Sequence, residues 1–256
     1  MELGMQNDPL VRLAEDIAKS FRSIDDNDKA KNIYKVLVLH FFNKSWRTFE
    51  SIHLLCANRF GQEAGILLRS FLELVVSAVY ISKAPLSRAV LFGEYGYLEK
   101  RNFRRAVIEF QNANPGDEWI KRIVSSSSTK GVEDDDREYK RVKNNYPRKD
   151  SWSGKSIKDM AIEVGMHLHY ILYKMFCNVA HMSSMGTRNY FTVKGGTIEF
   201  TADGEDDITA RWHTACVYFY SIMALVNETF ELHFDDRLKA LSEMLLKRKP
   251  LAPKSC

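Results

Sequence analysis

A chain of 256 residues is long enough for one large domain or two small ones. Hydrophobic residues make up 45% and charged residues 27% of it, as in soluble globular proteins. The chain contains only thirteen glycines and six prolines, and this low number disfavours a turn-rich β architecture. The formal net charge of +4 permits an anionic partner without requiring one. The four cysteines are scattered, with no C-x-x-C pair and no histidine at metal-ligand spacing, so we expect reduced thiols and no metal site.

Several enzyme classes are disfavoured by the absence of their motifs. The sequence has no P-loop, G-x-S-x-G, H-E-x-x-H or dinucleotide fingerprint, so we expect no cofactor of those kinds. No charged-then-apolar leader precedes Asp8, which argues against a secretory signal. We therefore expect a cytoplasmic protein.

The first helices are predicted from capping signals and apolar spacing. Asp8 followed by Pro9 starts a helix, because an acidic N-cap and a proline at the first helical position are both favourable. A long helix with aromatic residues on its apolar positions is predicted from about 28 to 58. A tight connection at 59–61 follows, and the next helix begins at about Gln62.

The most apolar stretch of the chain runs from Ala64 to Ile81, yet it carries Arg69 and Glu73 at its centre. In a helix these two charges are i,i+4 neighbours on one face. A helix that is apolar on nearly all sides is a core helix, so we expect Arg69 and Glu73 to be partly buried and paired. The stretch approaches membrane-spanning length, but its central charges argue against insertion.

The region after Pro85 divides into a helix and a charged excursion. A helix is predicted over 86–112 and ends at an Asn-Pro-Gly turn. The segment 117–150 then combines a serine run with blocks of acidic and basic residues. It predicts either a solvated and partly flexible excursion or a cationic arm for an anionic partner.

The helix predicted over 156–182 carries a second polar stripe. Its members fall within an arc of about 80° and are Glu163, His167, Tyr170, Lys174, Asn178 and His181. Such side chains can form hydrogen bonds in fixed geometry, and histidine exchanges protons near neutral pH. The same stripe also fits an ordinary amphipathic face packed under a loop. His181 near the helix end is explained equally well by the helix dipole.

The only convincing β signal is at 189–201, where two β-rich runs flank Lys194-Gly-Gly. A last helical region is predicted over 208–247, with a bend or break at Phe234-Asp235-Asp236. The sequence therefore predicts a mainly α fold: a single-domain helical bundle over 1–256, with one small β-hairpin inserted before the C-terminal helices.

These residues resemble an uncharacterised bacterial family, domain of unknown function 5677. The resemblance rests on Arg69-x-x-x-Glu73 in an apolar helix, on Trp152 before a helix, and on a tyrosine-rich helix with Tyr170 and Tyr173 that ends in His181. It implies a helical fold and no established activity. The stretch from Lys174 to His181, with Asn178 between them, also resembles the HEPN helical nucleases, although lysine stands where arginine is expected and the spacing is long.

Two functions fit these patterns. The first is a metal-independent endoribonuclease of a bacterial toxin or phage-defence type that acts on RNA, with a homodimer as the hypothesis for its assembly. Its residues and roles are assigned as follows: His181 as acid or base, Lys174 and Arg69 as cations, Asn178 as a positioning group, Glu73 as the residue that holds Arg69, and Tyr170, His167 and Trp152 as substrate contacts. The second is a non-catalytic helical module, a partner-binding or regulatory subunit, in which Arg69 and Glu73 form a structural pair and the basic excursion contacts nucleic acid or protein.

Overall fold

The computed structural model describes residues 8–21, 32–119, 121–122, 132–146, 151–181, 191–194, 196–200 and 205–247. The predicted fold class, a mainly α-helical bundle with one small β-hairpin before the C-terminal helices, is confirmed. The chain groups into two compact units: residues 1–83 with 157–256, and residues 84–156. Whether 1–256 behaves as one domain stays a prediction.

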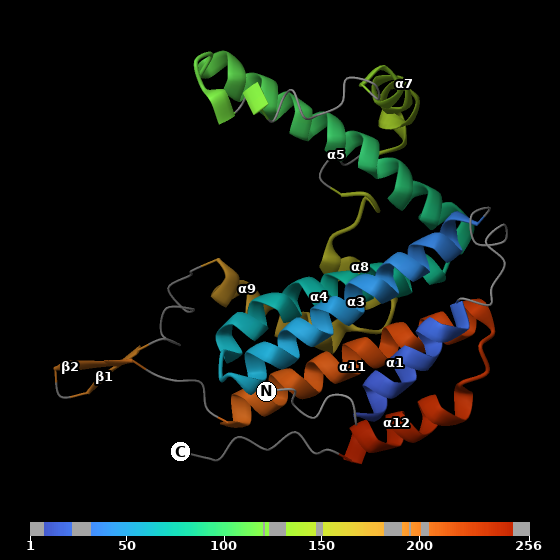
Figure 1. Ribbon diagram of the computed structural model, residues 1–256, viewed down its shortest axis with the longest axis vertical. Helices are drawn as coiled ribbons and strands as arrows, with labels where there is room; N and C mark the ends of the chain where they lie inside the picture. The colour runs from blue at the N-terminus through green and yellow to red at the C-terminus, as the bar shows by residue number, and fades with distance from the viewer. Residues whose placement is uncertain are drawn as a thin grey trace. The chain divides into compact units, whose positions relative to one another are not determined.

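The core of the larger unit is built from three long helices that lie side by side: α3 (Ile33–Ala57), α4 (Gly61–Ser82) and α11 (Glu205–Phe230) (Figure 1). Phe49 of α3 stacks on Phe219 of α11 with ring centroids 4.7 Å apart, and both rings are fully buried. Aromatic burial of this kind supplies much of the stability of a helical core. α1 (Pro9–Ser20) and α12 (Asp235–Lys247) complete this side of the unit.

Two helix starts follow from capping. Asp8 is the N-cap of α1, and its carboxylate accepts a hydrogen bond from the Leu10 amide at 2.8 Å, as predicted. α3 begins at Ile33, later than the predicted start near residue 28, because Asn32 is in an extended conformation and its side chain accepts from the Tyr34 amide. An N-cap of this kind fixes where a helix can begin.

α4 is the predicted core helix, and thirteen of its residues are buried. Among the described residues it is also the one helix long and apolar enough to cross a membrane by length and composition, but most of its apolar stretch is buried inside the unit. A core helix of a globular protein passes the same test, so the absence of a membrane and the cytoplasmic location stay predictions.

The predicted helix over 156–182 is wrong as a single element. α8 (Ile157–Glu163) ends before α9 (His167–Ala180) begins, and Gly165 between them has φ +76°. This backbone conformation suits glycine and interrupts a helix. The predicted break near Phe234 is confirmed, since α11 ends at Phe230 and α12 begins at Asp235.

The predicted hairpin forms from β1 (Phe191–Lys194) and β2 (Thr197–Phe200), which pair antiparallel with Phe191 opposite Phe200. Gly196 in its turn has φ +82°, the conformation for which glycine is favoured.

The smaller unit consists of α5 (Pro85–Ala113), α7 (Val132–Val142) and a short 3-10 helix, η4 (Lys143–Asn145). Leu98, Val142 and Tyr146 form its buried core. Part of the predicted excursion is therefore helical and packed on α5, because Val142 and Tyr146 have an apolar surface to cover. Residues 123–131 and 147–150 of that excursion lie outside the described residues.

Candidate functional site

The contact between α4 and α9 brings together two of the sequence motifs. The helices approach closely at Gly65, where a Cβ atom would lie 3.3 Å from the Phe176 ring. Phe176 and Val179 are the buried residues of α9. Because Gly65 has no side chain, α9 packs closely against α4. This close packing positions the polar residues of α9 next to Arg69 and Glu73.

Arg69, Glu73 and Tyr173 form a polar cluster at this contact. Arg69 Nη2 lies 3.3 Å from Glu73 Oε1, and the Tyr173 hydroxyl donates a hydrogen bond to the same oxygen at 2.8 Å. The guanidinium carbon lies 5.5 Å from the centre of the Tyr173 ring, within cation–π range. The side chains of Arg69 and Glu73 are 26% and 36% exposed, so the predicted pair exists and is partly buried but not sealed.

The electrostatics of the cluster favour a charged arginine and a neutral tyrosine. Burial and the hydrogen bond to Glu73 raise the pKa of Tyr173 to about 12. The Tyr173 hydroxyl, and then the charge of Glu73, raise the pKa of Arg69. At neutral pH the tyrosine therefore acts as a hydrogen-bond donor that ties α9 to α4, and it is poorly suited to accept a proton from a substrate.

Sequence reasoning missed Tyr173 as a site residue and chose Tyr170 instead. The Tyr170 ring stacks on the Tyr173 ring with centroids 5.5 Å apart, so Tyr170 borders the cluster. The signal for Tyr173 was its place one turn from Phe176 and Cys177 on α9, but its partner lies 100 residues away in the chain. Only the packing of α9 on α4 selects it.

The other predicted site residues are not gathered into this cluster. Lys174 and His181 are exposed and Asn178 is half-buried; His181 is the C-cap of α9. Eight residues separate Tyr173 from His181, a rise of about 12 Å along a helix. In the part of the chain that the structure describes, no hydrogen bond or ion pair joins Lys174 or His181 to Arg69 or Glu73.

The remaining members of the predicted polar stripe also separate. Glu163 belongs to α8 and His167 is the exposed first residue of α9, so the break at Gly165 removes the continuous arc on which they were aligned. Trp152 belongs to the smaller unit, where its ring packs edge-to-face on Phe92 at 5.1 Å. Its assignment to a substrate site stays a prediction.

α9 exposes apolar side chains that an amphipathic helix ordinarily buries. Leu168 is 67%, Ile171 60% and Met175 58% exposed. Their spacing of three and four residues places them in one strip. Exposed apolar strips of this kind mark binding surfaces, and we call these three residues the α9 strip. The sequence predicts Leu168 and Met175 on the apolar face opposite the polar stripe, but it did not single out Ile171 and could not show that these side chains stay exposed.

A small cavity of about 150 Å³ lies beside the α9 strip, between α9 and α11. Its floor is apolar, and Asp207 and Arg211 of α11 contribute polar groups. The cavity is large enough for one or two side chains and too small for a nucleotide. It extends the apolar surface of α9 toward α11 and provides room for a side chain inserted from outside.

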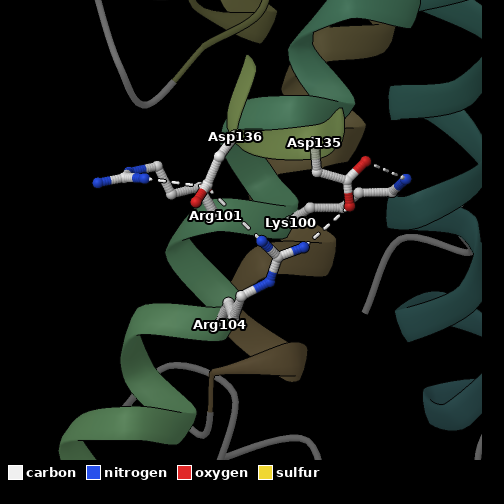
Figure 2. Close-up of polar contacts among 5 residues, drawn as sticks. All are labelled: Lys100, Arg101, Arg104, Asp135 and Asp136. Atoms are coloured by element: carbon white, nitrogen blue, oxygen red, sulfur yellow. Dashed lines mark hydrogen bonds and ion pairs between the residues drawn. The ribbon is translucent and has the colours of Figure 1, made fainter. Parts of the chain in front are cut away.

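In the smaller unit, basic residues of α5 face acidic residues of α7. Arg104 lies 2.9 Å from Asp135 and 3.6 Å from Asp136, Lys100 lies 3.4 Å from Asp135, and Arg101 lies 3.1 Å from Asp136 (Figure 2). These cations are therefore neutralised within the unit. These cations belong to α5 and not to the segment 117–150, so the prediction of a cationic arm stays a prediction.

The comparisons with known proteins identify the family. A family model described as "Family of unknown function (DUF5677)" matches residues 35–198. This range includes α4, α9 and the smaller unit, residues 84–156. The chain belongs to DUF5677. Neither the curated proteins nor the solved structures contain a match to the chain, so the likeness to HEPN nucleases gains no support from them. The matched range includes Arg69, Glu73 and Tyr173, and the description of the family names no activity.

Proposed function

We propose that this DUF5677 chain is a non-catalytic helical module that binds a protein partner through the outer face of α9. The observation that carries the proposal is the α9 strip, in which three large apolar side chains stand more than half exposed on one helix face. Burying such side chains contributes about 1.5–3 kcal/mol each. A partner that covers the strip stabilises the complex by this free energy of burial, which the isolated chain does not gain.

The Arg69–Glu73–Tyr173 cluster has a positioning role in this proposal. Tyr173 is held by Glu73 at 2.8 Å, and it lies on the side of α9 that faces α4. The contact fixes the rotation of α9 about its axis, so that the strip points outward. A salt bridge that is neither sealed nor joined to His181 supports this role better than catalysis.

The strip and its flank indicate an amphipathic helix as the occupant. Leu168, Ile171 and Met175 cover two helical turns, which matches the apolar face of a partner helix with anchors at i, i+3 and i+7. Lys174 is exposed beside the strip, and no carboxylate among the described residues pairs with it. An acidic residue flanking the apolar face of the partner helix complements this charge.

Site-specific photocrosslinking in cells tests the proposal. A benzoylphenylalanine replaces Ile171 in the α9 strip, and in a matched control it replaces Leu54, an exposed apolar residue of α3. We expect a discrete crosslinked protein from position 171 alone. Its crosslinked segment, identified by mass spectrometry and synthesised as a peptide, is then titrated against the purified chain.

The titration distinguishes specific binding at the α9 strip from nonspecific hydrophobic binding. Leu168→Asp together with Met175→Asp should weaken peptide binding at least about tenfold, roughly 1.4 kcal/mol or more, whereas Leu54→Asp should leave it unchanged. Lys174→Glu should weaken it in a salt-dependent manner. Identical crosslinks from both positions, or a crosslinked segment that does not bind as a peptide, contradict the proposal.

Metal-independent RNA cleavage is the second candidate. It is favoured by one observation: Lys174 and His181 are exposed on the outward side of α9, with Asn178 between them. A histidine and a cation on one face can transfer a proton and stabilise a phosphate in the transition state. The absence of a described link from His181 to Arg69 or Glu73 makes it the weaker candidate.

Incubation of the purified chain with RNA of mixed sequence, with and without chelator, tests the second candidate. Cleavage that persists in chelator, leaves 2′,3′-cyclic phosphate ends and disappears in His181→Ala would support it. The His40→Ala variant is the matched control, because His40 is an exposed histidine of α3 with no role in this hypothesis. Intact RNA, or equal cleavage by His181→Ala, rules it out.

A further inference from the structure

The C-terminal half of α5, in the smaller unit, carries a second exposed apolar strip. Phe103 is 66% and Phe110 55% exposed, and Ala106 and Ala113 are exposed on the same face. These four residues, which we call the α5 strip, recur at spacings of three and four residues. On a helix they fall within an arc of about 80°.

The strip lies on the side of α5 away from α7. Arg101 and Arg104, which pair with Asp136 and Asp135, are about 140–160° around the helix from the centre of the strip. α7 therefore leaves the strip uncovered. Large phenylalanine side chains standing in water on a helix face indicate an interaction surface.

We propose that two copies of this chain pair through the α5 strip, with the two α5 helices antiparallel. The strip alternates large and small residues in the order Phe103, Ala106, Phe110, Ala113. In an antiparallel pair Phe103 lies opposite the partner's Ala113, and Phe110 lies opposite the partner's Ala106. Each ring then fills the space beside an alanine, and two-fold symmetry repeats both contacts.

The charges around the strip fit a second copy better than a nucleic acid. The four positions carry no charge, and Arg105 next to them pairs with Glu109 at 3.0 Å. Glu99, one turn before Phe103, faces the region beyond the end of the partner's helix. Antiparallel pairing therefore brings no like charges together at the four strip positions, and the one acidic approach, between Glu99 and the partner's Asp117, lies beyond the end of the partner's helix. A polyanion would require free cations, and Arg101, Arg104 and Arg105 are each paired with an acid.

The size of the strip sets the strength of the pair. Two half-exposed phenylalanines with their alanine neighbours bury roughly 400 Å² per chain, about half of the 800 Å² per partner in a stable complex. We therefore expect a weak dimer with a Kd of roughly 10–100 μM. It forms when the concentration of the chain is raised and dissociates on dilution.

Sedimentation velocity of the full chain tests the pairing over about a hundredfold range of concentration around the expected Kd. The weight-average sedimentation coefficient should rise with concentration toward that of a dimer. Phe103→Asp and Phe110→Asp should each raise the Kd at least tenfold. Leu86→Asp is the matched control, because Leu86 is an exposed apolar residue of the same helix outside the strip, and it should have no effect.

Disulfide trapping tests the register. In a background with Cys177 and Cys256 replaced by serine, a chain with Phe103→Cys is mixed with a chain carrying Ala113→Cys and oxidised gently. The antiparallel pair predicts mainly the mixed disulfide, whereas a parallel pair predicts dimers of each variant alone. Circular dichroism confirms that every variant stays folded.

Three outcomes overturn the inference: a monomer at all concentrations, a dimer unaffected by Phe103→Asp and Phe110→Asp, or a preference for disulfides within each variant. Single-stranded RNA binding that requires Phe110 in a strictly monomeric chain would assign the strip to nucleic acid instead. The α9 variant Leu168→Asp should leave the dimer intact, so this test and that of the α9 strip fail independently.

Discussion

The contact of α9 with α4 and the contact of α7 with α5 both join charged residues, but they are held in different ways. At the first, one arginine, one glutamate and one tyrosine meet beside the buried Phe176. At the second, Lys100, Arg101 and Arg104 make exposed or half-exposed ion pairs with Asp135 and Asp136, while Tyr146 is buried in the core of the same unit. Exposed ion pairs contribute little to the free energy of unfolding. The contact of α7 with α5 has more charged residues, but it need not be the stronger of the two.

The largest expected effect comes from the apolar anchor of α7. Tyr146 is buried, and its hydroxyl donates to the Leu91 carbonyl oxygen at 2.7 Å. Tyr146→Ala should destabilise the docking of α7 by about 3 kcal/mol, since it leaves a cavity and removes the hydrogen bond to the Leu91 carbonyl oxygen. Hydrogen exchange of the amides at 132–142 should accelerate by about a hundredfold. Tyr146→Phe, which keeps the ring, should cost only about 1 kcal/mol.

Removal of Glu73 is expected to have the next largest effect. Glu73→Ala takes the acceptor from both Arg69 and Tyr173, and it should lower the free energy of unfolding by about 2 kcal/mol, less than for a sealed pair because both charges are partly exposed. Chemical denaturation measures this loss.

A double-mutant cycle of Glu73→Ala with Tyr173→Phe tests the link between the two helices. We expect a coupling free energy of about 1 kcal/mol. Additive losses would show that Tyr173 does not depend on Glu73. Glu63→Ala serves as a control, because Glu63 is an exposed acid of the same helix.

The ion pairs between α5 and α7 are expected to have a smaller effect. Asp135→Asn with Asp136→Asn should cost about 1 kcal/mol in total. In the wild type, raising the salt concentration to about 1 M, where the Debye length is about 3 Å, should produce a similar loss. Salt should have little further effect on the double variant. A loss as large as that of Tyr146→Ala would reverse the ranking of charge and apolar burial in this unit.

The smallest expected effect is a dependence on pH at the inner side of α9. Burial lowers the pKa of His169, whose ring lies 5.5 Å from the Tyr218 ring. Below about pH 6.5 the His169 imidazole becomes protonated in the unfolded chain, whereas the folded chain binds this proton less readily. The free energy of unfolding therefore decreases as the pH falls through that range.

Unfolding measured between pH 7.5 and 5.5 should therefore show a smaller loss of stability in His169→Phe than in the wild type. His167→Phe is the control, because His167 is exposed on the same helix. An equal loss in all three proteins would assign the pH dependence to other groups.

Local features of the sequence determined the parts of the structure that depend on neighbours along the chain. Asp8 and Pro9 start α1, the composition of 64–81 makes α4 a core helix, and the i,i+4 spacing of Arg69 and Glu73 brings the two charges to 3.3 Å. The hairpin around Gly196 follows from its turn residues. In each case the relevant geometry is fixed within about one helical or hairpin turn.

The tertiary structure decided the features that depend on distant partners. Glu73 selects Tyr173 rather than Tyr170, because the rotation of α9 is set by Phe176 resting at Gly65. The apolar arc of α9 stays partly exposed, since no described element covers Leu168, Ile171 and Met175. Charge runs predicted either a solvated excursion or a cationic arm over 117–150, but they could not show that Asp135 of α7 pairs with Arg104 of α5, 31 residues away in the chain. Side-chain spacing specifies which residues share a helix face, but only the packing of the helices determines what that face meets.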